Sequence, residues 1–250
     1  MAALPSVAVI IPAFNAAPFL RRAVESVWAT EYPHLQVAII DDGSRDETVA
    51  VARQLCAEAP GRCRLLEHGD GGHHGVSATR NLGLANTDSA WVAFLDGDDT
   101  YLPNRFACLT RDAPYLAATD AIYGLTRMHF DGAPPPETVG WWSSTGDDLF
   151  GIREPLTDAA LLARMLLGVT WHTGAITVRR WLLDSTGGFD PEKRIAEDCD
   201  LWFRIAAIGK VVPDDLSQPI SRYHRHDSNT YAYRIEHRVP MVLAMLDAWR

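Results

Sequence analysis

The chain has 250 residues, of which 47% are hydrophobic and 22% charged, enough for a substantial globular core without a disulfide or metal staple. Its formal net charge of −9 argues against nucleic-acid binding, which relies on a basic surface. An acidic protein that binds a phosphorylated ligand needs a divalent cation or a few placed basic side chains. No C-x-x-C pair, secretory signal or apolar run of ~18 residues is found. We therefore expect a reduced, cytoplasmic protein without a transmembrane segment.

Residues 1–125 alternate short apolar runs with amphipathic patterns. The runs are rich in β-branched residues, which is typical of strands buried on both faces. They predict strands at residues 7–11, 37–40, 64–67, 91–95 and 121–125. Between them, helical periodicity predicts helices that begin near Pro18, after a capping box of Ser44 and Glu47, and at Val76. This alternation indicates an α/β fold with a mostly parallel central sheet and helices on both faces.

The second half of the chain is less regular. Residues 130–155 contain three consecutive prolines and two adjacent tryptophans, which predicts a long loop. Further patterns predict a helix over 156–167, a strand over 175–178, a helix over 197–208 that Gly209 ends, a loop over 222–233 and a last helix near 239–249. No repeat or linker divides the sequence, so we expect one domain over residues 1–250.

Polar segments follow three of the predicted strands, at residues 12–15, 41–44 and 96–99. In parallel sheets, ligands bind beyond the carboxyl ends of the strands. Two of these segments carry five carboxylates, from Asp41, Asp42, Asp96, Asp98 and Asp99. The sequence therefore predicts a ligand site at this edge of the sheet.

The segment Asp96-Gly97-Asp98 is the sharpest local signal. Carboxylate oxygens are the ligands that Mg²⁺ and Mn²⁺ prefer, and Gly97 would let a ligand approach the backbone. A solvated acidic turn is an equally good interpretation of three residues taken alone.

Two further acidic segments have both a structural and a functional interpretation. Asp42 belongs to an ordinary strand-to-helix turn, yet a carboxylate there can accept a hydrogen bond from the imide N–H of a nucleobase. The acids at residues 197–200 precede an amphipathic helix, where they interact favourably with the helix dipole. The same dipole favours the ionised carboxylate that a general base requires.

Four segments in a fixed order resemble the family 2 glycosyltransferases with the GT-A fold. They are VAVIIPAFNAAPFLRRAVESVWATEYPHLQVAIIDDGSRDET, GVSATRNLGL, FLDGDD and GGFD…EDCDLWFR, and together they cover roughly residues 5–210. The ordered set is far more specific than any one motif.

The resemblance implies inverting transfer of a sugar from a nucleoside-diphosphate sugar to an acceptor hydroxyl, with Mn²⁺ or Mg²⁺ as cofactor. Residues 1–100, approximately, would bind the nucleotide sugar in a Rossmann-like half. Residues 101–250, approximately, would bind the acceptor and supply the catalytic base. Uridine or thymidine donors are favoured, the acceptor is a small molecule, a glycan or a peptide, and a homodimer is possible.

The resemblance also implies roles for individual residues of this sequence. Nucleobase and ribose would lie at Pro12, Ala13, Phe14 and Asp42, with Arg80 of the T-R-N segment near the diphosphate. Asp96 would face the ribose, Asp98 would bind the metal, and Asp198 would be the catalytic base. A late motif is matched only in part, by Arg222 as a phosphate contact and His224 as a metal ligand, with His226 as the alternative histidine.

Several features leave alternatives open. His73 and His74 depart from the asparagine-containing turn usual in the family, so their roles are undecided. The segments 130–155 and 221–234 are expected to shape the acceptor pocket with Trp141, Trp142, Tyr223 and Tyr231, or to use these aromatic residues only in packing.

Two rival functions have sequence signatures of their own. A nucleotidyltransferase should show a glycine-rich phosphate loop with a basic residue after the first strand, and the sequence IIPAFNAAPFLRR has none. A non-catalytic nucleotide-binding module is disfavoured because Asp96, Asp98 and Asp198 are all present. A retaining mechanism usually needs a second carboxylate as nucleophile, and nothing in the sequence nominates one.

Overall fold

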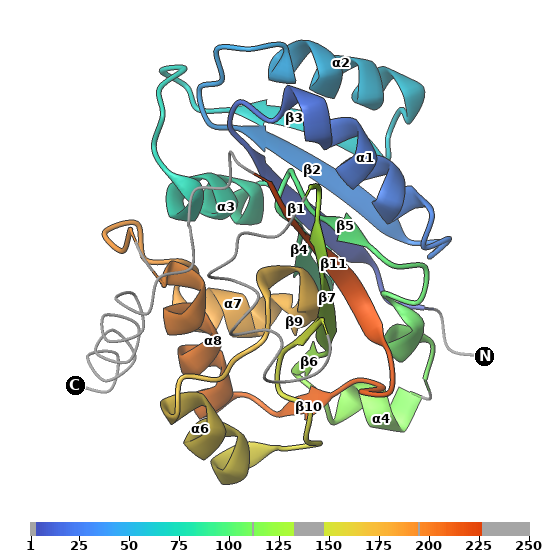
Figure 1. Cartoon of the computed structure of the whole chain (residues 1–250), viewed down its shortest axis with the longest axis vertical. Coiled ribbons are helices and arrows are strands. Elements are labelled where there is room, and N and C mark those ends of the chain that lie inside the picture. The colour runs from blue at the N-terminus through green and yellow to red at the C-terminus, as the bar shows by residue number, and fades with distance from the viewer. Residues whose placement is uncertain (1–3, 112, 133–147, 195, 227–250) are drawn as a thin grey trace.

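A seven-stranded sheet forms the centre of the computed structural model, which describes residues 4–111, 113–132, 148–194 and 196–226 (Figure 1). Its strand order is β10-β6-β9-β4-β1-β2-β3. The strands are β1 Val7–Ala13, β2 Leu35–Asp41, β3 Cys63–Glu67, β4 Trp91–Phe94, β6 Ala121–Tyr123, β9 Ile176–Arg179 and β10 Val211–Pro213. Neighbouring strands are parallel except where β9 pairs with β4 and β6. The predicted α/β fold with a mostly parallel sheet is confirmed.

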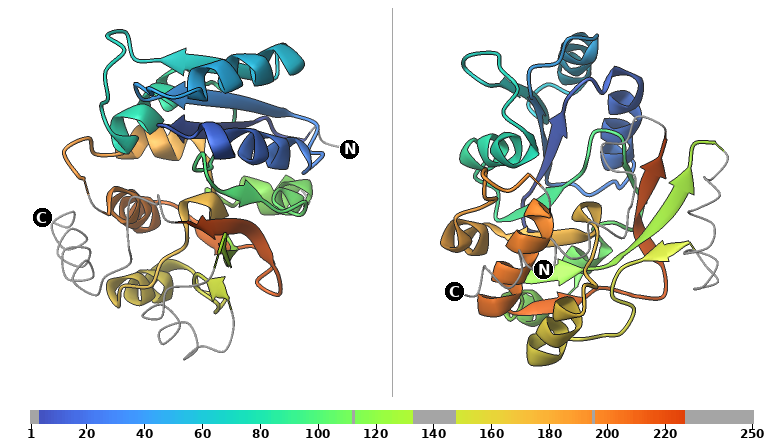
Figure 2. Two further views of the ribbon diagram at one scale, coloured as in Figure 1. Left: turned by 45° about the horizontal axis from the view of Figure 1, so that its top comes forward. Right: turned by 60° about the vertical axis from the view of Figure 1, so that its left-hand side comes forward.

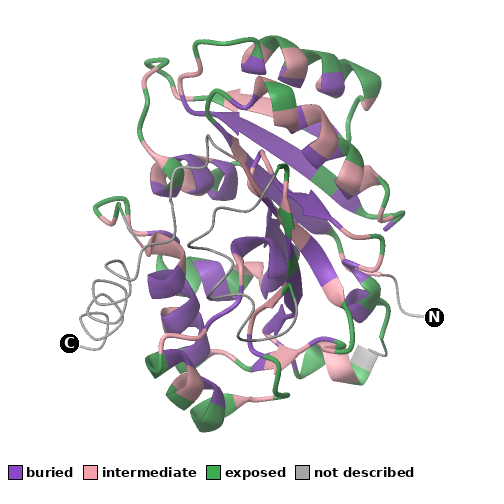
Figure 3. Ribbon diagram, in the orientation of Figure 1, coloured by how far each residue is buried: buried purple, intermediate pink, exposed green. Residues whose placement is uncertain are grey.

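Helices cover both faces of this sheet. One face packs against α1 Ala17–Trp28, α2 Thr48–Glu58 and residues near the 3-10 helix η1 Ala107–Thr110. The other face packs against α3 Val76–Ala85, α6 Asp158–Leu166, α7 Arg180–Thr186 and α8 Glu197–Ile208. A short helix, α4 Ala113–Ala117, precedes β6. The inner strands β1, β2, β4, β6 and β9 are buried from both sides (Figure 3), as apolar runs predict, whereas the edge strand β3 is mostly half-buried or exposed.

A second sheet of four strands has the order β5-β11-β7-β8. It combines β5 Thr100–Tyr101, β7 Leu125–Phe130, β8 Leu149–Phe150 and β11 Pro219–Arg225, so its strands come from distant parts of the sequence (Figure 2). β5 begins directly after the acidic segment that follows β4. The second sheet therefore brings β11 to the same edge of the large sheet where the predicted site lies.

Buried Arg105 joins the two halves of the chain behind this edge. Its guanidinium donates to the carbonyl oxygens of Gly174 (3.0 Å) and Ile176 (2.6 Å) and to Oγ1 of Thr177 (2.7 Å). Its side chain is fully buried, so three acceptors in the turn η2 Thr173–Ala175 and in β9 depend on it. Arg105 thereby fixes η2 relative to the segment after β5.

Some local predictions are confirmed and others are wrong. The helices predicted from Val76 and over 197–208 are present. The capping box is wrong, because α2 begins at Thr48 and Glu47 makes no capping bond. Instead, Oγ of Ser44 accepts from the backbone N–H of Asn15 (2.9 Å) and ties this turn to the end of β1.

The two halves of the predicted strand over 121–125 belong to different sheets, because the chain passes from β6 through Gly124 into β7. The predicted loop over 222–233 is wrong for its first four residues, which belong to β11. These residues have polar side chains and lack the apolar pattern from which a strand is predicted. The helix expected near 239–249, most of the loop 130–155, Trp141, Trp142 and Tyr231 lie outside the described residues.

All four cysteines are free thiols. Among the described helices, none has the length and apolar character that crossing a bilayer demands.

Candidate active site

The three predicted strand-end segments lie together because β4, β1 and β2 are adjacent in the sheet. The backbone N–H of Asp42 donates to the carbonyl oxygen of Ala13 (2.9 Å), which joins the ends of β2 and β1. A Cβ atom on Gly97 would lie 3.1 Å from the carbonyl oxygen of Pro12. A side chain at position 97 would therefore crowd the end of β1, which is a second reason for glycine here beside the ligand approach that the sequence suggested.

Arg80 of α3 is almost completely buried and bridges two carboxylates. Its guanidinium lies 2.7 Å from Oδ1 of Asp96 and 3.0 Å from Oε1 of Glu197, and it packs over the ring of Phe189. Burial opposes the charge, but the two carboxylates still raise the pKa of Arg80 above its ordinary value. Arg80 therefore holds the end of β4 and the start of α8 in fixed positions.

The acid Glu197 is perturbed by this environment. Burial and the nearby charge of Asp198 raise the pKa of Glu197 to about 7, against the opposing effect of Arg80. Burial also opposes ionisation of Asp96, but Arg80 and His172 lower the pKa of that carboxyl below its ordinary value.

Asp98 contacts a histidine of the late motif. Its Oδ2 lies 3.1 Å from Nε2 of His226, whose ring stacks on Phe19. Burial and the charge of Asp96 raise the pKa of Asp98. The geometry therefore brings His226, the alternative histidine, to the acidic segment.

His224, the histidine favoured from the sequence, has other partners. Its side chain is buried, with Nε2 3.1 Å from Oγ1 of Thr100 and Nδ1 3.1 Å from Oδ1 of Asp131. Burial lowers the pKa of His224, although Asp131 opposes this effect.

Arg222 faces the same side of β11 as His224, because side chains alternate along a strand. It lines a cavity of about 630 Å³ between α1 and the second sheet, together with Arg22 and Thr100. Tyr223 points to the other side, where its ring lies 4.7 Å from that of His172. Among Arg222, Tyr223 and His224, Tyr223 is therefore the one that points toward His172 and the acids after β4.

Sequence reasoning placed Asp99 at the predicted site without giving it a role of its own, and it missed His172. Asp99 accepts from the backbone N–H of His224 with Oδ1 (2.8 Å), and its Oδ2 lies 3.6 Å from Nε2 of His172. Burial, Asp98 and Asp96 raise the pKa of Asp99 well above its ordinary value. The third acid of FLDGDD was the available signal for Asp99, whereas a lone histidine after a tryptophan gave none for His172.

The ring of His172 is oriented by the turn that Arg105 holds. Its Nδ1 accepts from the backbone N–H of Gly174 (3.2 Å), so Nε2 faces the carboxylates. Ligand atoms of Asp96, Asp99 and His172 all lie within 4.8 Å of one another. Burial lowers the pKa of His172 in spite of the nearby acids.

These residues fit a divalent cation. The buried Oδ2 of Asp99 has no hydrogen-bond donor in the described part of the chain. The carboxylates of Asp96, Asp98 and Asp99 lie close enough for their charges to repel one another, which favours a bound cation. Carboxylate oxygens are the donors that suit Mn²⁺ and Mg²⁺. A second group that could hold a metal consists of His129, Asp131 and His224.

The three acids at the start of α8 have different surroundings. Asp200 is buried and paired with Arg204 (2.7 Å) and Lys193 (3.3 Å), and Glu197 is paired with Arg80. Asp198 is partly exposed, and its carboxylate accepts from the backbone N–H of Cys199 (2.7 Å) and from Oγ1 of Thr173 (3.3 Å). No ion pair to Asp198 is found among the described residues, so it alone of the three has no directly paired cation, and only the longer-range charge of Arg80 acts on it.

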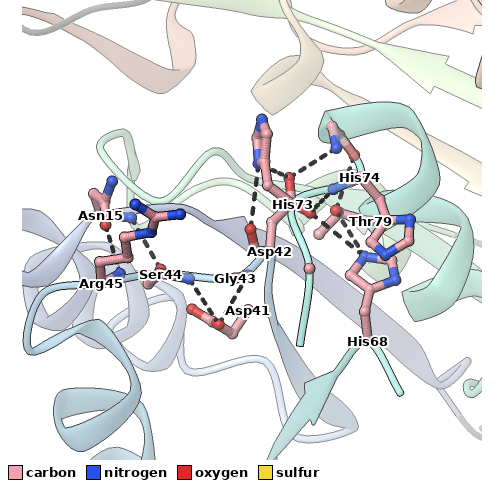
Figure 4. Close-up of polar contacts among 12 residues, drawn as sticks. Asn15, Asp41, Asp42, Gly43, Ser44, Arg45, His68, His73, His74 and Thr79 are labelled. Carbon is pink, nitrogen blue, oxygen red and sulfur yellow. Dashed lines mark hydrogen bonds and ion pairs between the residues drawn. The ribbon is translucent and has the colours of Figure 1, made fainter. Parts of the chain in front are cut away.

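Asp42 lies at the opposite end of the site, buried beneath the loop that precedes α3 (Figure 4). Its Oδ1 accepts from the backbone N–H of His74 (2.7 Å), and its Oδ2 accepts from that of Gly75 (3.0 Å). Nδ1 of His73 lies 2.9 Å from the same Oδ2. The ring of His73 packs at 4.2 Å against that of Phe14, which remains 46% exposed.

Comparison with known proteins places these features in a family. The family described as "Glycosyl transferase family 2" matches residues 8–146. An uncharacterized glycosyltransferase of Nostoc sp. is 29% identical over 230 residues, which are 90% of this chain and 66% of that protein. This chain thus spans slightly less than two thirds of that relative.

Solved structures share the fold. TarS 1-349 of S. aureus in complex with UDP-GlcNAc aligns with a TM-score of 0.68 and 14% identity, over 96% of this chain and 66% of that one. The mannosyltransferase PcManGT of Pyrobaculum calidifontis in complex with GDP-Man and Mn²⁺ aligns with a TM-score of 0.63 and 16% identity, over 99% and 70%. Since the family match covers more than half of the sequence and the structure has the GT-A fold, the chain belongs to glycosyl transferase family 2.

Proposed function

We propose that this glycosyltransferase moves a sugar from a nucleoside-diphosphate sugar to an acceptor hydroxyl, with inversion at the anomeric carbon. The observation that carries the proposal is the position of Asp198. It is a partly exposed carboxylate without a cation partner among the described residues, next to a cluster of acids at the strand ends. That combination supplies one base and one cation site, which is what a single displacement requires.

The donor would lie across the ends of β1, β2 and β4. Pro12, Ala13 and Phe14 with Asp42 would form the base end, and Asp96 would face the ribose. Arg80 would act by holding Asp96, since both of its arms are engaged with carboxylates. The titles of the two structural neighbours name UDP-GlcNAc and GDP-Man, which supports a nucleotide-sugar donor but leaves the base open.

Mn²⁺ or Mg²⁺ would be held by Asp98 with His226, close to Asp96, Asp99 and His172. When bound, the cation supplies positive charge for the departing diphosphate. His226 takes the place given to His224 from the sequence, because it is the histidine that contacts Asp98. Arg222 and His224 face α1 and have no part in this proposal.

Asp198 would remove the proton of the acceptor hydroxyl while the oxygen attacks the anomeric carbon and the diphosphate leaves from the opposite side. Cys199 and Thr173 hold its carboxylate in one orientation, as a base requires. The neighbouring acids Glu197 and Asp200 are paired with cations, so neither is available as a nucleophile for a retaining mechanism. Tyr223 beside His172 would border the acceptor.

A binding screen tests the donor site. UDP, dTDP, GDP, CDP and ADP are titrated calorimetrically with Mn²⁺, with Mg²⁺ and with excess chelator. We expect binding of at least one nucleotide that the chelator weakens at least tenfold, and equal affinity in the chelator would refute the metal-assisted donor site.

A turnover assay follows, in which nucleotide release from the sugar nucleotides of the preferred base is measured with panels of sugar and peptide acceptors. Turnover distinguishes an enzyme from a binding module. The anomeric configuration of the product, read by NMR, tests inversion. A product with retained configuration would refute the role proposed for Asp198.

A further inference from the structure

His73 belongs to the loop between β3 and α3, and its side chain is 55% exposed. Three contacts hold the ring. Nδ1 lies 2.9 Å from Oδ2 of Asp42 and 3.2 Å from the backbone carbonyl oxygen of Asp42, and the ring packs on that of Phe14 at 4.2 Å and 30° (Figure 4). In Figure 4 the second ring nitrogen, Nε2, points away from Asp42. The imidazole therefore rests on Phe14 and turns Nδ1 toward the carboxylate and the backbone carbonyl of Asp42.

Two of these contacts, with the ring of Phe14 and with Oδ2 of Asp42, are the ones that a donor nucleobase is expected to make here. A uracil or thymine would lay its ring on Phe14 and donate its imide N–H to Asp42. Oδ1 of Asp42 accepts from the backbone N–H of His74, and Oδ2 accepts from that of Gly75 and lies 2.9 Å from Nδ1 of His73. A base N–H that approaches Oδ2 would therefore have to take the position that His73 now fills.

We propose that the His73 side chain occupies the nucleobase subsite of the free protein, and that a nucleotide binds by displacing it. The inference rests on the proposed function, because it takes a nucleoside diphosphate as the ligand of these strand ends. His73 is then an internal competitor for the base and contributes nothing to binding of the diphosphate.

The loop allows this movement without a change of its backbone. A Cβ atom on Gly43 would lie 2.8 Å from the carbonyl carbon of Gly72, so the loop main chain packs tightly on the turn after β2. The backbone N–H groups of His74 and Gly75 continue to hold Asp42 when the imidazole leaves. Only the half-exposed side chain of His73 has to rotate, which exposed side chains do in nanoseconds.

Competition of this kind has a quantitative signature. The apparent affinity of any ligand that needs the subsite falls by the fraction of molecules in which the subsite is vacant. Removal of the competitor should therefore strengthen every nucleoside diphosphate by the same factor. A residue that touched the base directly would instead change uridine and cytidine nucleotides by different factors, because only uracil offers an imide N–H.

The test measures Kd values by calorimetry with Mn²⁺ for UDP, CDP and inorganic pyrophosphate. In the variant His73→Ala we expect UDP and CDP to bind about three- to tenfold more tightly, by equal factors, which corresponds to one hydrogen bond and one ring contact removed from the competitor. Pyrophosphate should bind with unchanged affinity, since it does not enter the base subsite.

Two further variants make the test specific. His73→Phe keeps a ring for Phe14 but has no N–H for Asp42, so its gain should be smaller than that of His73→Ala. His74→Ala is the matched control from the same loop, because the His74 side chain contacts Asp70 (2.8 Å) and His68 (4.2 Å between rings), while its backbone still binds Asp42. This control should bind all three ligands like the parent protein.

Weaker UDP binding in His73→Ala, or unequal changes for UDP and CDP, would overturn the proposal and make His73 a direct contact of the base. Unchanged affinities would also overturn it. If neither the parent nor His73→Ala binds any nucleotide while both fold normally, the proposed function itself fails, which is a separate result.

Discussion

The replacement Asp198→Asn tests the mechanism most directly. Asparagine keeps an acceptor oxygen for the backbone N–H of Cys199, and its amide still reaches Oγ1 of Thr173, but it cannot take a proton. Loss of a general base lowers a rate by about 10²–10⁴, or about 2.7–5.4 kcal/mol at 1.36 kcal/mol per factor of ten. Because Asp198 is partly exposed and keeps both contacts, the free energy of unfolding should change by less than about 0.5 kcal/mol.

The neighbouring acid Asp200 provides the contrast. It is 2% exposed, and Asp200→Asn removes the charge that pairs with Arg204 and Lys193. Because both cations are partly exposed, the loss of unfolding free energy should be about 1–3 kcal/mol, below that of a fully buried pair. The folded fraction of this variant should keep most of the parental transfer rate.

The assay combines nucleotide release per folded molecule, with the preferred sugar nucleotide and acceptor, and urea unfolding of each variant. Nucleoside-diphosphate affinity is measured in parallel and should stay unchanged in Asp198→Asn. The reasoning is refuted if Asp198→Asn turns over near the parental rate, and most clearly if Asp200→Asn is inactive while folded.

Three further predictions concern the cation, the core and pH. In Asp98→Asn, addition of Mn²⁺ should no longer strengthen nucleoside-diphosphate binding measured by calorimetry, whereas the exposed control Asp88→Asn should behave like the parent. Arg105→Met leaves three acceptors without a donor, so urea unfolding should show a loss of about 3–5 kcal/mol. A loss below about 1 kcal/mol, comparable to that of exposed Arg62→Met, would contradict this reasoning. Because the pKa of Glu197 is raised to about 7 in the folded protein, the fold favours the protonated acid, and this stabilisation disappears as pH rises from about 4.5 to 7. The stability of Glu197→Gln relative to the parent should therefore increase by up to about 3 kcal/mol between pH 4.5 and pH 8, and a constant difference would contradict the shift.

The parallel core was predictable from the sequence because its signals are local. Runs such as Val7–Ile11 are short, apolar and β-branched without alternation, which is typical of a strand covered on both faces. Once such strands alternate with helices, the direction of each strand follows, and the segments after Ala13, Asp41 and Phe94 must meet at one edge. The acidic character of that edge and the family of the chain could therefore be predicted without coordinates.

Other features depend on pairing between segments that are distant in the sequence, which local periodicity does not reveal. β11 is a polar strand that is recognisable only beside β5 and β7, and its alternation turns Arg222 and His224 toward α1. A sequence motif likewise does not show which opposite charge pairs with a given acid. Only the tertiary structure shows that Asp200 and Glu197 are paired with cations while Asp198 is not, and that His73 rests on Asp42. Sequence spacing determines which residues reach the edge of the sheet, whereas their roles follow from the charges and rings that the fold places within a few ångströms of them.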